Sequence, residues 1–256
     1  MRTIATSFLL IALIGLAWAV HDPAGAYWNV RTLALQRGDL AAAEEALLRT
    51  GPAALPALMR GLHSADSPAQ FHCAKVLMVL GEPEGEEFLF DTLRAHPDPQ
   101  DAIGREAQAF LIAAWDRRNG PDSALRQKLR EAEVQGHAPH ILKALNECLA
   151  QYSNWADGYA RRARIYQQSG EIQEAHRNAL NALSRAPNHF EALVTLGRIQ
   201  LMADSPQQAY KSFERALQVN PRLKNMLAQD IKDTLKAMDA DKEKHRDEKR
   251  RNATLV

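Results

Sequence analysis

The chain has few cysteines, few aromatic residues and almost no excess of charge of either sign. Its 256 residues include two cysteines, 6% aromatic residues, 32 Lys and Arg residues and 31 Asp and Glu residues, which gives a formal net charge of +1. Nucleic-acid binding needs clustered positive charge in excess of negative charge. The composition therefore argues against nucleic acid as a partner.

The chain also lacks the short motifs that carry catalytic chemistry. It contains no nucleophile elbow, no phosphate-binding loop and no zinc signature. His137 and His140 are close in sequence, but no cysteine or carboxylate stands at a recognised ligand spacing, and a zinc site needs three or four ligands. We favour plain turn histidines over a metal site there. We predict that the protein is not an enzyme and holds no cofactor.

Only one long apolar run is present, and it lies at the N-terminus. Arg2 precedes residues 4–20, which carry no charge, and small-x-small sites end at Ala19 and Ala26. Seventeen residues only just cross a hydrocarbon core of about 30 Å. We interpret residues 1–26 as a cleavable export signal or an uncleaved membrane anchor. Either predicts a periplasmic or secreted protein, free or anchored to the membrane and facing outward.

The two cysteines lie one in each half of the chain. Cys73 falls in an apolar helical run and Cys148 at a small-residue position of a helix. We expect both to be buried free thiols; the alternative is a Cys73–Cys148 disulfide, since an exported chain meets an oxidising compartment.

A spacing of 34 residues relates two segments of the second half, one starting at Ala156 and one at Phe190. Bulky and small residues and a closing proline recur at positions 4, 8, 11, 20, 27 and 32. They are Tyr159, Ala163, Tyr166, Ala175, Ala182 and Pro187 in the first copy, and Leu193, Gly197, Gln200, Ala209, Ala216 and Pro221 in the second. This register predicts two helical pairs that stack on each other.

The pattern resembles the tetratricopeptide repeat family. A third, worn copy starts at Asp122, where Leu125, Leu129 and Ala132 keep the apolar side and Gly136 matches Gly170 at the turn. Residues 222–238 lack the small-residue pattern and are expected to form a capping helix. The resemblance therefore covers 122–238 and implies a surface that holds another protein.

Residues 27–120 show a second kind of helical pattern, broken at short intervals by Gly and Pro. Its best-matching pair runs from Gly51-Pro52 through Leu80-Gly81. This stretch resembles HEAT-like helical repeats, although the arginine frequent early in the second helix is replaced by Gln70-Phe71. We expect an all-α solenoid, with HEAT-like pairs followed by tetratricopeptide repeats and a cap. The charged tail at 239–256 is expected to be a solvated extension of the last helix that frays into disorder.

The resemblance also implies a binding groove. In this repeat family the first helix of each pair lines the groove, and positions 2, 5, 9, 12 and 13 face a bound peptide. Ala160 and Val194 at position 5 depart from the carboxylate-clamp subfamily, so binding of a chaperone tail is not supported. The other positions carry the candidate groove residues Asp157, Arg164, Gln167, Gln168, Glu191, Arg198, Leu201 and Met202.

Arg164 and Arg198 share position 9, so their guanidinium groups would line one wall and could grip carboxylates. The alternative is that they form ion pairs within the stack, with Asp157 or Glu191. We interpret the chain as an exported scaffold or assembly adaptor that holds a polypeptide. If Arg164 and Arg198 line the groove, this polypeptide is expected to be acidic. The alternatives are a structural subunit of a membrane-associated complex and, less favoured, an enzyme or a cell-wall binding protein.

Overall fold

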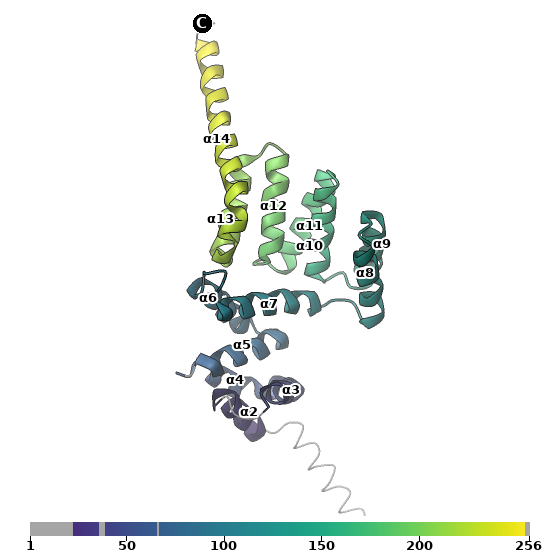
Figure 1. Cartoon of the computed structure of the whole chain (residues 1–256), viewed down its shortest axis with the longest axis vertical. Helices are drawn as coiled ribbons and strands as arrows, with labels where there is room; N and C mark the ends of the chain where they lie inside the picture. The colour runs from purple at the N-terminus through teal and green to yellow at the C-terminus, as the bar shows by residue number, and fades with distance from the viewer. Residues whose placement is uncertain (1–22, 36–38, 66, 254–256) are drawn as a thin grey trace, which may run out of the picture. The chain divides into compact units, whose positions relative to one another are not determined.

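The computed structural model describes residues 23–35, 39–65 and 67–253, and the regular elements in these ranges are all helices (Figure 1). The chain divides into two compact units, residues 1–92 and 93–256. The predicted export signal or anchor falls on residues 1–22, which lie outside the described residues, and α2 begins at Pro23. No helix within the described ranges is long and apolar enough to span a bilayer.

The first unit consists of short helices packed in pairs. They are α2 (Pro23–Leu35), α3 (Leu40–Thr50), the 3₁₀ turn η1 (Gly51–Ala54), α4 (Leu55–Leu62), α5 (Ser67–Leu80) and the start of α6 (Pro83–Ala95). Asp39 caps α3 by accepting a hydrogen bond from the Ala42 amide. Leu33 of α2, Leu47 of α3 and Leu58 of α4 are fully buried.

Close backbone approach shapes the core of this unit. A Cβ atom on Gly61 would lie 2.4 Å from the Cys73 sulfur, so α4 and α5 can approach this closely only with glycine at residue 61. Burial, and secondly the charge of Glu44, raises the pKa of the Cys73 thiol to about 12. Both Cys73 and Cys148 are buried and free, which confirms the prediction of buried free thiols.

The second unit is a stack of antiparallel helix pairs (Figure 1). The helix α7 (Ala102–Arg117) precedes the pairs, and the last pair is followed by the 3₁₀ turn η2 (Pro221–Leu223) and by α14 (Lys224–Ala253), which packs on α13. The pairs are α8 (Ser123–Gln135) with α9 (Ala138–Gln151), α10 (Ala156–Gln168) with α11 (Ile172–Arg185), and α12 (Phe190–Met202) with α13 (Pro206–Val219). Helix starts at Ala156 and Phe190 confirm the 34-residue register, and the worn copy also forms a pair.

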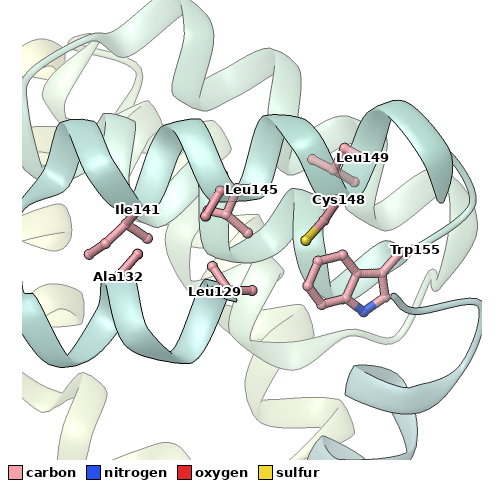
Figure 2. Packing of buried hydrophobic residues seen from close by; sticks show 8 residues of the cluster. Leu129, Ala132, Ile141, Leu145, Cys148, Leu149 and Trp155 are labelled. Atoms are coloured by element: carbon pink, nitrogen blue, oxygen red, sulfur yellow. The ribbon is translucent and has the colours of Figure 1, made fainter. Parts of the chain in front are cut away.

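The repeat positions pack as their residue types require. Gly197 at position 8 lies beneath the ring of Phe213 at position 24, and a Cβ there would come within 2.6 Å of that ring. In the pair α8–α9, a buried cluster fills the space between the two helices and reaches the next repeat through Trp155 (Figure 2). It consists of Leu129, Ala132, Ile141, Ala144, Leu145, Cys148, Leu149 and Trp155.

The helix α7 runs across the ends of the repeat helices (Figure 1). Residues that stand one repeat apart contact it. The Trp155 Nε1 donates a hydrogen bond to the Asp116 carbonyl oxygen at 2.9 Å. Thirty-four residues later, the His189 ring stacks on Trp115 with 4.3 Å between ring centroids. The side chain of Arg222 then donates to the carbonyl oxygens of His96 and Pro99, both at 2.9 Å. The segment 96–117 therefore braces successive repeats.

The C-terminal helix runs from the predicted cap into the charged tail. We expected a capping helix to about residue 238 and then a solvated helical extension that frays, and α14 continues as one helix to Ala253, so the extension is helical over most of the charged tail. It is held on the stack by an ion pair between Arg198 and Asp230 and by a hydrogen bond from Gln207 to Asp241. In Figure 1 it runs past the ends of α12 and α13.

Candidate binding groove

The predicted groove residues lie on α10 and α12, the first helices of two neighbouring pairs. Arg164 and Gln168 are exposed on α10. The Gln167 Nε2 lies 3.5 Å from the Met202 sulfur, so residues from α10 and α12 meet on one face. Leu201 is half-buried beside Met202, which is exposed.

The two arginines at position 9 differ in their surroundings. The Arg198 guanidinium donates to Asp230 Oδ2 through Nε at 3.1 Å and through an Nη atom at 2.9 Å. Arg164 has no hydrogen bond or ion pair with any residue that the structure describes. Arg198 therefore forms an ion pair within the stack, as the alternative expected, but its partner is Asp230 and not Asp157 or Glu191. The guanidinium group of Arg164 can still bind a ligand.

Asp157 is buried, with 2% of its surface exposed. Its Oδ2 accepts a hydrogen bond from Arg161 Nε at 2.6 Å, and its Oδ1 lies 3.4 Å from His189 Nε2. Burial raises the pKa of Asp157, but the contact with His189 and the charge of Arg161 outweigh burial and hold the pKa below its ordinary value. Asp157 is thus an ionised internal acceptor.

A pocket of about 430 Å³ brings three of the predicted residues together. Its lining draws on α7, α8, α9, α10 and α12, and consists of Ile112, Glu133, Ile141, Asp157, Arg161, Arg164, Ile165 and Glu191. Gln167, Gln168, Arg198, Leu201 and Met202 do not line it.

The charge centre of the pocket is Arg161, which sequence reasoning missed. Its Nη atoms reach Asp116 at 2.9 Å and Glu133 at 3.1 Å, in addition to the bond from Nε to Asp157. Burial lowers the pKa of Arg161, but the three carboxylates outweigh burial and raise it. The only one of these three ion pairs that the sequence could indicate is Asp157–Arg161, because residues four positions apart lie on the same face of a helix. The other two acids are 28 and 45 residues away in sequence.

The contacts of His189 were also not foreseen. Its Nδ1 accepts a hydrogen bond from the Ala192 amide at 3.3 Å, which caps α12. The proton therefore sits on Nε2, which faces Asp157 and has no well-aligned acceptor among the described residues. A fully buried imidazole thus joins α7, α10 and α12 from the turn before α12.

The described residues contain no group of three or more His, Cys, Asp or Glu side chains arranged to hold a metal ion. The rings of His137 and His140 lie close, with centroids 5.4 Å apart, but both residues are exposed at the turn into α9.

Comparison with known proteins finds similar solved structures but no match by sequence. No protein-family model matches the chain, and no curated protein is similar to it by sequence. A solved structure described as the crystal structure of MamA protein shows 17% identity and a TM-score of 0.33, over 80% of this chain and 94% of that one. The TPR2AB domain of yeast Sti1, solved as a complex with pHSP90, shows 18% identity and a TM-score of 0.40, over 87% of this chain and 88% of that one.

The class of the protein follows from its own geometry. Helix pairs at a 34-residue spacing, stacked in chain order and closed by a further helix, make the second unit an all-α helical repeat like that of tetratricopeptide proteins.

Proposed function

We propose that the protein is a scaffold that holds a polypeptide of another protein against α10 and α12. The observation that carries this proposal is Arg164, whose guanidinium group is exposed at a pocket and has no partner among the described residues. Its five donors are free to bind a carboxylate or main-chain carbonyl groups. A stacked helical repeat offers such a surface without catalytic chemistry of its own.

The test is a crosslinked pull-down from host cell envelopes, with the full chain as bait. The variant Arg164→Glu is expected to lose the partner that the wild-type chain captures. Arg177→Glu is the matched control, because Arg177 is an exposed arginine on α11 whose described ion pair is with Glu174 of the same helix. Capture of the same partner by Arg164→Glu and by the wild-type chain would rule out this surface.

Arg198 belongs in a separate variant. Because Arg198→Glu would face Asp230, it would disturb α14 as well as the groove, and loss of a partner could not be assigned to either. Arg198→Gln keeps a donor and avoids the repulsion. We expect it to retain the partner.

Export is a further part of the proposal, in which the scaffold works as an assembly adaptor outside the cytoplasm. It is supported by the uncharged run at 4–20 behind Arg2. Fusion of residues 1–26 to alkaline phosphatase, which is active only after export, tests this, and an inactive fusion would exclude it.

Membership of the tetratricopeptide family for 122–238, and the HEAT-like character of 27–120, belong to the same proposal. They are supported by the residue patterns and, for the former, by the paired helices.

A further inference from the structure

The pocket combines an apolar lining with two opposite charges that no described group neutralises. Ile112 of α7, Ile141 of α9 and Ile165 of α10 supply the apolar surface. Arg164 and Glu191 line the same pocket, and neither forms an ion pair with the other or with another described residue. A ligand can therefore meet one free cation, one free anion and aliphatic side chains together.

The remaining charges of the lining are already engaged. Arg161 binds Glu133 and Asp157 of the lining, and also Asp116, which is further bound by Arg126. A charged ligand group would have to displace one of these hydrogen-bonded pairs, which costs more than binding a free group. Recognition therefore falls to Arg164 and Glu191.

The charge balance of the lining also limits the partner. Three acids, Glu133, Asp157 and Glu191, stand against two bases, Arg161 and Arg164, so the lining carries one negative charge in excess. A uniformly acidic segment would gain one contact with Arg164 and meet repulsion from Glu191. This argues against the acidic partner that the two arginines of position 9 suggested.

We propose that the pocket binds a segment of a partner polypeptide in which an aliphatic side chain is flanked by one acidic and one basic residue. The aliphatic side chain packs on the isoleucines, the acid binds Arg164, and the base binds Glu191. A volume of about 430 Å³ exceeds that of one side chain and leaves room for main chain. The inference rests on the proposed function and narrows the partner it would hold.

The specificity is tested by fluorescence anisotropy, with labelled synthetic peptides titrated with the purified full chain. The peptides are Gly-Lys-Gly-Leu-Gly-Glu-Gly, the same peptide with Lys and Glu exchanged, and an acidic peptide with Glu at both places. One of the two mixed peptides is expected to bind at least about tenfold more tightly than the acidic peptide, since one charge-assisted contact replaces one repulsion. Equal or tighter binding of the acidic peptide, or no binding of either mixed peptide, would overturn the inference.

Two sets of variants locate the contacts. Exchanging the charges in Arg164→Glu/Glu191→Arg is expected to invert the preference between the two mixed peptides, and an unchanged preference would contradict the assignment. Ile112→Asn is expected to weaken binding about tenfold. Ile103→Asn, at an exposed isoleucine of the same helix outside the pocket, serves as control and should leave affinity unchanged.

The two proposals fail in different ways. If an envelope partner depends on Arg164 but the acidic peptide binds best, the scaffold stands and the mixed-charge specificity falls. If Arg164→Glu captures the same partner as the wild-type chain, the scaffold surface itself is wrong.

Discussion

At the scale of single residues, the turn between the two helices of each pair shows the repeat most directly. Gly136, Gly170 and Asp204 stand 34 residues apart and have φ angles of 71°, 77° and 54°. The left-handed region suits glycine and is disfavoured for residues with a Cβ atom. The sequence predicted the first two turns from their matching glycines. The third turn was not predicted, because it has aspartate in place of glycine while the backbone keeps the left-handed conformation.

Asp204→Gly is therefore expected to stabilise the protein, by about 0.5–1 kcal/mol, because glycine removes the steric cost of the left-handed conformation. Asp204→Ala should destabilise it by a similar amount, since alanine keeps the Cβ atom and loses the local hydrogen bonding open to aspartate. Urea unfolding measures both. A ranking other than Gly, Asp, Ala would show that the turn does not control stability.

The burial of Asp157 departs from the family's assignment of repeat position 2 to the surface of the groove. The resemblance places position 2 of the repeat on the surface that faces a peptide. In this chain Asp157 is instead buried and engaged by Arg161 and by the turn residue His189, which stacks on Trp115 of α7. Since α7 lies outside the repeats, nothing in the 34-residue pattern signals its presence.

The lowered pKa of Asp157 predicts a pH dependence of stability. An unfolded aspartate titrates near pH 3.9, so below about pH 4 the unfolded chain binds a proton that the folded chain resists. The contribution of Asp157 is present above that pH and is lost as pH falls through the folded pKa. Asp157→Asn should cost about 1.5–3 kcal/mol at pH 7, the value of a hydrogen bond to a charged group, and should reduce the fall in stability between pH 5 and pH 2.

Chemical denaturation at each pH measures this difference. Asp239→Asn is the control, because Asp239 is an exposed carboxylate of α14. An acid dependence in Asp157→Asn as steep as that of the wild-type chain would contradict the assignment.

At the scale of elements, the helix pairs of the second half and the helical extension into the charged tail were predictable, but the residue at which that helix ends was not. Interleaved charges fit a solvated helix and a frayed end almost equally well, so they do not mark the boundary. Pairs along the helix, such as Lys242 with Asp239, support the helical form. The Arg198–Asp230 pair escaped prediction for a related reason, because the capping helix lacks the repeat pattern that would have given its register.

The segment 96–117 depends on one side chain of η2. Arg222 is 8% exposed, and it donates to the carbonyl oxygens of His96 and Pro99 and to the Gln108 side chain. Arg222→Met should destabilise the second unit by about 2–4 kcal/mol, since it removes several hydrogen bonds that a buried charged side chain donates. Arg222→Lys keeps the charge but loses the planar set of guanidinium donors. Its stability should lie between those of the wild-type chain and Arg222→Met.

Hydrogen exchange checks where this effect acts. Amides of α7 should lose protection in Arg222→Met, while amides within the pair α10–α11 should lose little. Uniform loss across the unit would mean that Arg222 does not act through α7.

At the scale of the molecule, the all-α class and the stacking of pairs could be predicted because both depend on local periodicity. The pocket could be predicted only in part. Arg164 and Glu191 follow from the repeat register, whereas Arg161, Ile112 and the divided roles of Arg164 and Arg198 depend on contacts between residues far apart in sequence. Periodicity carries no information on such contacts.

The contacts of Arg222 also bear on how the second unit folds. In an ordinary solenoid each repeat touches only its neighbours, so the repeats can fold and melt nearly independently. Here Arg222 binds residues more than 100 positions earlier, at the start of the same unit. Closing that loop costs chain entropy before the contact can form, which slows folding. The same closure ties the end of the last repeat to the segment that precedes the first repeat, so the unit gains the cooperativity of a globular domain.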